Sequence, residues 1–218
     1  MLEIAQAGGW LMLPIIVCSI LAAAIILERL WTLQPKRVAP TDLTSKVWQW
    51  VRQGQLSHGR IQILHQGSPL GQILAAGLEK RSAARDAIKD TIEDRGRHVV
   101  HELERYLSLL GTIAAISPLL GLLGTVIGMV KVFAAITARG VGDPAVLAGG
   151  ISEALVTTAA GLCVAIPSLI GYRYFRGRVD GLVVRMEKEV IKFLEALSHH
   201  QNKDNLDSEF SGPSKRRS

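Results

Sequence analysis

Three long runs of uncharged residues dominate the hydrophobic pattern of this chain. They are 20, 25 and 19 residues long and cover residues 8–27, 106–130 and 154–172. A helix needs about 20 residues, at about 1.5 Å of rise each, to cross roughly 30 Å of hydrocarbon. Each run is therefore long enough to span a membrane. We expect an all-α membrane protein whose three transmembrane helices lie at residues 10–30, 106–137 and 148–172.

Two further stretches have apolar residues at helical spacing among many charged ones. The stripe before the second run consists of Ile88, Ile92, Val99, Leu103 and Leu107. The stripe after the third run consists of Val179, Leu182, Met186, Val190, Phe193 and Leu197. Spacings of three and four indicate amphipathic helices that pack against neighbours. We therefore expect long helical extensions of the second and third spans, the former unbroken and weakest at Gly96.

Basic residues are distributed unevenly around the three runs. Of the 25 Lys and Arg, 13 lie in residues 29–105 and 10 lie after residue 172. Cytoplasmic segments carry the excess of Lys and Arg in membrane proteins. We therefore expect an outer N-terminus and an outer loop at residues 1–9 and 138–147. The cytoplasmic parts are then a helical domain, a helix and a disordered tail at residues 31–105, 173–200 and 201–218.

The remaining composition excludes several classes of function. The net charge of +6 follows from this topology, and no basic face interleaved with aromatic residues indicates nucleic-acid binding. The first run lacks a preceding basic segment and is long, so we expect a retained anchor and not a signal peptide. No phosphate-binding loop or nucleophile elbow is present, and His98 and His101 fit a solvated helix face better than a metal site. Cys18 and Cys163 lie singly within hydrophobic runs. We expect no enzyme activity, no metal and no cofactor.

Glu153 is the acidic residue nearest the membrane interior. It precedes Arg173, which marks the inner boundary of the third span, by 20 residues. A helix of that length rises about 30 Å, so Glu153 is expected near the outer edge of the hydrocarbon. Two interpretations remain open. Glu153 either begins the helix, where the helix dipole favours a carboxylate, or faces a hydrated path through the membrane.

Small and hydroxyl residues form a stripe along each of the last two spans. The second span carries Ala114, Ser117, Gly121, Thr125 and Gly128, and the third carries Ala154, Thr158, Gly161, Ala165 and Ser168. Such faces let helices approach closely in lipid. We assign helix packing to Gly121, Gly124, Gly128, Gly161, Pro118 and Pro167. The prolines also free carbonyls within the spans, and Thr125 and Thr158, at similar depth, are candidates to line a path for water or protons.

Two segments of the last two spans carry recognisable motifs: ISPLLGLLGTVIG at residues 116–128, and GISEALVTTAAG at residues 150–161, the latter followed by AIP at residues 165–167. These segments resemble the MotA/TolQ/ExbB proton channel family. The resemblance implies a homopentamer in the inner membrane of a Gram-negative bacterium, with the lipid bilayer around it and the outer side in the periplasm. It implies an ExbD-like or TolR-like single-span partner with a membrane aspartate, and a TonB-like or TolA-like protein that spans the periplasm.

The same resemblance assigns roles to individual residues. Thr125 and Thr158 would face the aspartate of the partner, and Glu153 would be the acidic residue of the lumen. Thr157 is a secondary candidate because it shares the helix face of Glu153. Three spans argue against the MotA branch. The sequence of the second-span motif favours an ExbB-like subunit, which would energise TonB-dependent import of iron chelates and cobalamin. A TolQ-like subunit of the Tol-Pal envelope system and a passive membrane scaffold remain as alternatives.

Overall fold

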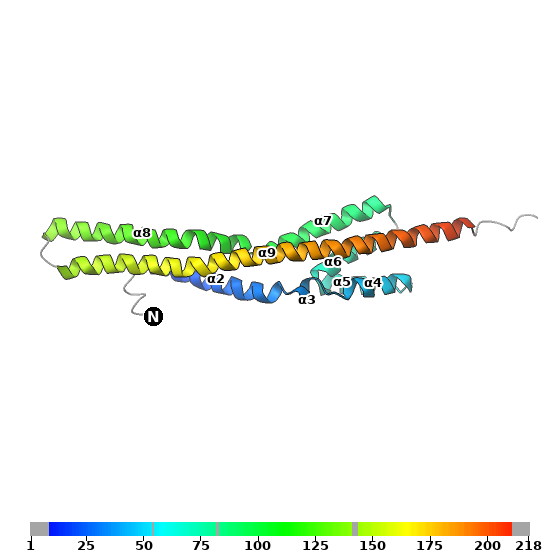
Figure 1. Ribbon diagram of the computed structural model, residues 1–218, viewed down its shortest axis with the longest axis horizontal. Coiled ribbons are helices and arrows are strands. Elements are labelled where there is room, and N and C mark those ends of the chain that lie inside the picture. The colour runs from blue at the N-terminus through cyan, green and yellow to red at the C-terminus, as the bar shows by residue number, and fades with distance from the viewer. Residues whose placement is uncertain (1–8, 54, 82, 141–143, 211–218) are drawn as a thin grey trace, which may run out of the picture. The chain divides into compact units, whose positions relative to one another are not determined.

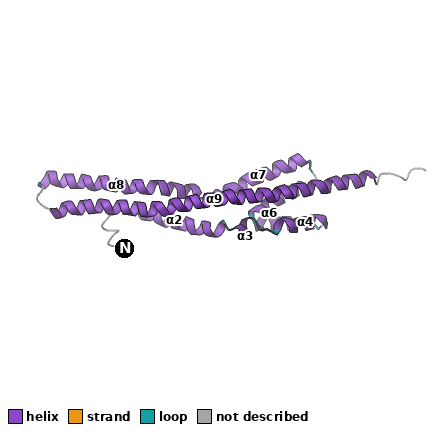
Figure 2. Cartoon of the chain, in the orientation of Figure 1, coloured by secondary structure: helices purple, strands orange, loops and turns teal. Residues whose placement is uncertain are grey.

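The computed structural model describes residues 9–53, 55–81, 83–140 and 144–210, and every regular element in these ranges is an α-helix (Figures 1 and 2). The chain divides into two compact units. The first, which we call the membrane unit, comprises Met1–Trp31 and Glu104–Gly177. The second, which we call the extramembrane unit, comprises Thr32–Leu103 and Arg178–Ser218. The expected outer N-terminus lies almost wholly outside the described residues.

The membrane unit is built from α2 (Met12–Thr32), α8 (Leu107–Arg139) and the first part of α9 (Pro144–Phe210). Figure 1 shows α8 and this part of α9 side by side. Three stretches of helix are long and apolar enough to cross a membrane. They lie within Met12–Thr32, within Arg85–Ala138, which includes α8, and within Leu147–Ser198 of α9, and the mean hydropathies of their most apolar parts are 2.2, 2.2 and 1.9. The prediction of three membrane-spanning helices is therefore confirmed.

The turn between α8 and α9 is shorter than the predicted loop at residues 138–147. α8 ends at Arg139, and the next residue, Gly140, caps it: Gly140 has a φ of 69° and donates its N–H to the Ile136 carbonyl at 2.8 Å. Glycine adopts this conformation without the steric cost that a Cβ would add. α9 already begins at Pro144, because proline suits the first turn of a helix. Residues 141–143 lie outside the described part of the chain.

The predicted unbroken helix from the charged segment into the second span is wrong. Two residues separate α7 (Arg85–Glu104) from α8, and one of them, Tyr106, has a left-handed φ of 63°. This conformation costs a non-glycine residue about 1–2 kcal/mol. The Tyr106 ring lies 5.4 Å from the Arg29 guanidinium and 4.7 Å from that of Arg105. Such contacts contribute roughly 0.5–1 kcal/mol each and offset the cost. Gly96, the expected weak point, lies inside α7.

The extramembrane unit consists of short helices packed around a common apolar core. These helices are α3 (Pro35–Val38), α4 (Leu43–Arg52), α5 (His58–Gly67) and α6 (Pro69–Glu79), followed by α7 and the rest of α9. Both apolar stripes expected from the sequence are buried there, apart from Leu107, which is buried in the membrane unit. α6 is buried along most of its length, and a Cβ added at Gly77 would lie 2.7 Å from the Ile92 Cδ1 and 3.2 Å from the Phe193 ring.

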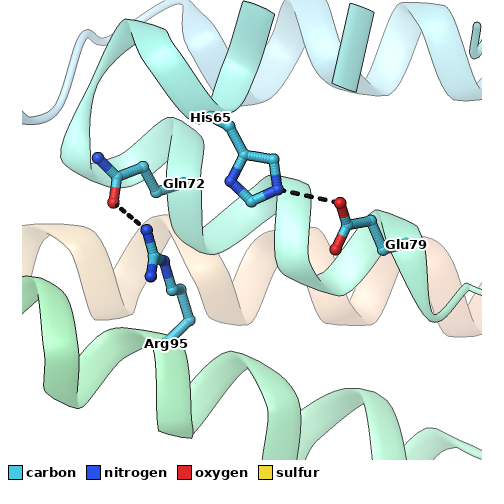
Figure 3. Close-up of polar contacts among 4 residues, drawn as sticks. All are labelled: His65, Gln72, Glu79 and Arg95. Carbon is cyan, nitrogen blue, oxygen red and sulfur yellow. Dashed lines mark hydrogen bonds and ion pairs between the residues drawn. The ribbon is translucent and has the colours of Figure 1, made fainter. Parts of the chain in front are cut away.

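Polar contacts join the helices at the edge of this core (Figure 3). His65 of α5 and Glu79 of α6 lie 3.1 Å apart, and Arg95 of α7 donates to the Gln72 side chain of α6 at 2.7 Å. Gln72 and Arg95 are partly buried, whereas the His65 contact is exposed. These contacts orient α5, α6 and α7 relative to one another.

α9 is longer than the sequence predicted. The tail at residues 201–218 was expected to be disordered, but α9 continues to Phe210. Elongation of an existing helix gains one hydrogen bond for each residue fixed, so a polar segment can extend it. The first glycine or proline after Gly181 is Gly212, so no strong helix breaker interrupts this stretch. The expectation for residues 211–218 lies outside the described residues.

Candidate functional site

The candidate site is built on an interface between α8 and α9 in which glycines replace side chains. A Cβ added at Gly161 would lie 2.5 Å from the Ser117 carbonyl oxygen, and one at Gly121 would lie 3.0 Å from the Thr158 Cα. Real Cβ atoms essentially never approach within 3.0 Å of another heavy atom. The two backbones therefore approach as closely as small residues permit.

Two further glycines continue this contact toward the turn between α8 and α9. A Cβ at Gly124 would lie 2.5 Å from the Thr157 Cγ2, and one at Gly128 would lie 2.7 Å from the Ala154 Cβ. The structure thus places all four glycines named from the sequence at the α8–α9 interface of one chain. Their contacts are within the subunit.

The two prolines named from the sequence lie inside helices. Pro118 is half-buried in α8, and Pro167 is exposed on α9. Neither can donate to the carbonyl four residues earlier. The adjacent serines donate to other carbonyls of the same helices, Ser117 to the Ile113 carbonyl at 2.8 Å and Ser168 to the Val164 carbonyl at 2.7 Å.

The three candidate threonines differ in burial but all donate to backbone carbonyls. Thr158 donates across the interface to the Gly121 carbonyl at 2.8 Å, and Thr125 donates within α8 to the Leu122 carbonyl at 2.6 Å. Both are partly exposed. Thr157 is 1% exposed and donates to the Glu153 carbonyl at 2.8 Å. A hydroxyl that donates in this way keeps its lone pairs. Thr125 and Thr158 can therefore still accept a hydrogen bond from water or from a protonated carboxyl group.

Glu153 forms an ion pair that sequence reasoning missed. Its Oε1 lies 2.7 Å from the Lys131 Nζ of α8, and the two side chains are 27% and 51% exposed. The interpretation that Glu153 begins its helix is wrong, because α9 begins nine residues earlier at Pro144. The sequence offered one signal for this ion pair: Lys131 is the first charged residue after the long uncharged run of α8.

Glu153 also lies against the segment that precedes α2. Gly9 has a φ of 68°, and a Cβ added there would collide with the Glu153 carboxylate. The carboxylate is therefore in contact with two other parts of the membrane unit, the Lys131 ammonium and the backbone at Gly9. Among the residues that the structure describes, no group of three or more His, Cys, Asp and Glu side chains is arranged to hold a metal ion.

Known proteins are similar to this chain over a region that includes the candidate site on α8 and α9. Residues 65–188 match the sequence profile of the MotA/TolQ/ExbB proton channel family. The chain is 32% identical to an ExbB-like biopolymer transport protein of Synechocystis sp., over 78% of this chain and 82% of that protein. It is 28% identical to biopolymer transport protein exbB1 of Vibrio cholerae, over 91% of this chain and 90% of that protein. It is also 28% identical to the Tol-Pal system protein TolQ of Pseudomonas aeruginosa, over 80% of each chain.

Proposed function

Because this chain belongs to the MotA/TolQ/ExbB proton channel family, we propose that it is the channel-forming subunit of an inner-membrane complex driven by the proton motive force. The observation that carries the proposal is the position of Thr125, Thr158 and Glu153. All three lie on α8 and α9 within the segment that matches the family, and all three are at least partly exposed. Their side chains are therefore accessible to a partner helix or to water.

The apolar surface of the membrane unit supports assembly with lipid and other helices. Large apolar side chains are more than half exposed on both helices of the site, among them Leu119, Leu122, Val126, Val130, Phe133, Leu155, Ile166 and Ile170. Surface of this kind is stable only against hydrocarbon or other apolar helices. We propose a homopentamer that surrounds the transmembrane helix of an ExbD-like or TolR-like partner.

The proton path that we propose runs between the partner and the hydroxyl groups of this chain. The membrane aspartate of the partner accepts a proton from the outer side and releases it toward the cytoplasm. Thr125 and Thr158 offer acceptor lone pairs to the protonated aspartate or to water, since both use their own protons on carbonyls. Thr157, which is buried, fixes the backbone next to Glu153.

The first candidate system is TonB-dependent import of iron chelates and cobalamin through an ExbB-like complex with a TonB-like protein. The Tol-Pal system, with a TolA-like protein, is the second candidate because a TolQ protein matches over 80% of this chain. Deletion of the gene separates the two. Failure to grow on chelated iron alone supports the first system, whereas detergent sensitivity and cell chaining alone support the second.

The test of the proton path is a pair of substitutions at one position. Thr158→Val keeps the shape of the side chain but removes its hydroxyl, at a cost of about 1 kcal/mol for the lost bond to Gly121. We expect an assembled complex with normal partner content and strongly reduced energised function. Thr158→Ser keeps the hydroxyl and should retain most function.

The outcome that contradicts the proposal is full function in Thr158→Val together with loss of function in Thr158→Ser. That result would show that the volume at this position matters and its hydrogen bonding does not. Full function in both Thr158→Val and Thr125→Val would favour a passive scaffold for the partner.

A further inference from the structure

We propose that Lys131 is a positioning residue for Glu153, and that Gly9 completes the contact by leaving space for the carboxylate. The inference rests on the proposed role of Glu153 in energised function. It concerns the orientation of the Glu153 side chain and assigns no proton transfer to Lys131 itself.

The ion pair joins two helices at a defined depth. Lys131 and Glu153 are 22 residues apart in sequence, and their charged atoms lie 2.7 Å apart. Eight residues of α8 follow Lys131, and nine residues of α9 precede Glu153. At about 1.5 Å per residue, the pair lies roughly 12 Å from the end of the α8–α9 hairpin. It is therefore not a tether of the turn.

Glycines on both helices let the ammonium reach the carboxylate. A Cβ added at Gly128 would lie 2.7 Å from the Ala154 Cβ, and one at Gly150 would lie 2.6 Å from the Val132 Cγ2. These residues lie within four positions of Lys131 or Glu153 along their helices. A bulkier interface would move the two charged groups apart.

The partial exposure of both side chains is consistent with a site at the edge of the hydrocarbon. A long lysine side chain can keep its stem on apolar surface while its ammonium reaches a polar neighbour. An ionised carboxylate near the hydrocarbon is costly without a partner of opposite charge. Lys131 is thus suited to hold the Glu153 side chain in one orientation. Without this partner, the Glu153 side chain would sample several rotamers.

Gly9 supplies the third contact. A side chain at this position would occupy the space of the Glu153 carboxylate, and the φ of 68° is itself unfavourable for other residues. The carboxylate is therefore close to both the Lys131 ammonium and the backbone at Gly9. Replacing either Lys131 or Gly9 should displace the carboxylate while leaving Glu153 in the chain.

The test compares neutral, conservative and exchanged charges at the pair. Lys131→Gln should assemble with the partner but lose most energised function, as we also expect for Glu153→Gln. Lys131→Arg should keep most function because it keeps the charge. Modification of Glu153 by a water-soluble carbodiimide, measured by mass spectrometry, should be several-fold faster in Lys131→Gln than in the parent or in Lys131→Arg.

The exchanged pair separates positioning from simple stabilisation. Lys131→Glu combined with Glu153→Lys should recover the thermal stability lost in Lys131→Glu alone, but it should not recover function, because the carboxylate then lies on α8. Recovery of both would overturn the inference by showing that the pair only stabilises the hairpin. A fully functional Lys131→Gln beside an inactive Glu153→Gln would also overturn it and leave the proposed function intact. A functional Glu153→Gln would overturn both.

Gly9→Ala provides an independent test that changes no charge. We expect reduced function, normal assembly and faster carbodiimide modification of Glu153. The matched control is Gly140→Ala, at a glycine with nearly the same φ, 69°, and open space around its missing Cβ. Parental function and labelling in Gly9→Ala would show that the segment before α2 does not restrain the carboxylate.

Discussion

Gly161→Ala adds one methyl group to the closest contact between α8 and α9. The new Cβ would lie 2.5 Å from the Ser117 carbonyl oxygen and 3.1 Å from the Gly121 Cα. Both neighbours are backbone atoms that no rotamer change can move, so the helices must separate by several tenths of an ångström. Overpacking of this kind costs about 1–3 kcal/mol. The higher helix propensity of alanine returns about 1 kcal/mol. We expect a net loss of up to about 2 kcal/mol in the free energy of unfolding.

Gly177→Ala is the matched control in the same helix. A Cβ at Gly177 would meet no heavy atom within 4 Å, and the residue is exposed. Only the helix propensity changes, so this variant should be more stable than the parent by about 0.5–1 kcal/mol. The same substitution should therefore have opposite signs at two positions 16 residues apart on α9.

The assay is reversible unfolding of the purified protein in mild detergent by titration with sodium dodecyl sulfate, followed by circular dichroism. Both variants and the parent are measured at one protein concentration, because subunit assembly would add a concentration-dependent term to the stability. The packing of α8 on α9 described above is refuted if Gly161→Ala is at least as stable as the parent while Gly177→Ala behaves as expected.

Three further predictions test other contacts. Gly150→Ala should destabilise the membrane unit by about 1 kcal/mol, and Val132→Ala should relieve the clash in the double variant, which thermal unfolding can measure as a coupling energy. Gly77→Ala should lower the stability of the extramembrane unit, and Ile92→Val, which removes the contacting Cδ1, should restore part of it in the same assay. The free energy of unfolding of Tyr106→Gly should stay within about 1 kcal/mol of the parent, because glycine accepts the left-handed φ. Tyr106→Ala should lose more stability, because it keeps the strain and loses the contact between the ring and Arg29. Equal losses in the two variants would contradict this account.

The helices were predictable because their signals are long and periodic. The uncharged runs indicated the length of the spans. The apolar stripes at residues 88–107 and 179–197 identified the buried face of the helix before the second span and that of the helix after the third span. The break at Tyr106 was not predictable. Nothing in the local sequence disfavours helix there, and the left-handed φ is accompanied by a contact with Arg29, which is distant in sequence. Gly96, which local propensity identified as the weak point, has no such contact and stays helical.

The site was predictable in its residue types and not in its pairing. Four glycines and the threonines stood out because small and hydroxyl residues recur at helical spacing in apolar runs. The partner of Glu153 depends on the register of α8 against α9, which single-helix periodicity does not determine. From the sequence, Lys131 therefore marked only the end of an uncharged run, and its ion pair with Glu153 could not be predicted. The hydrogen bond from Thr158 to the Gly121 carbonyl could not be predicted for the same reason.

The glycine contacts between α8 and α9 also limit how this hairpin can move. Packed helices usually accommodate conformational change by small sliding motions of one along the other. Here a shift along the axis would carry Thr157 and Ala154 away from the glycines that make room for them and toward bulkier neighbours, and would break the hydrogen bond from Thr158 to Gly121. Sliding of one helix along the other is therefore unfavourable, and we expect α8 and the facing part of α9 to move together. The proton-driven displacement that we propose is then expected along the outward faces of α8 and α9, so spectroscopic probes of that motion belong at exposed positions such as Leu122 and Val126.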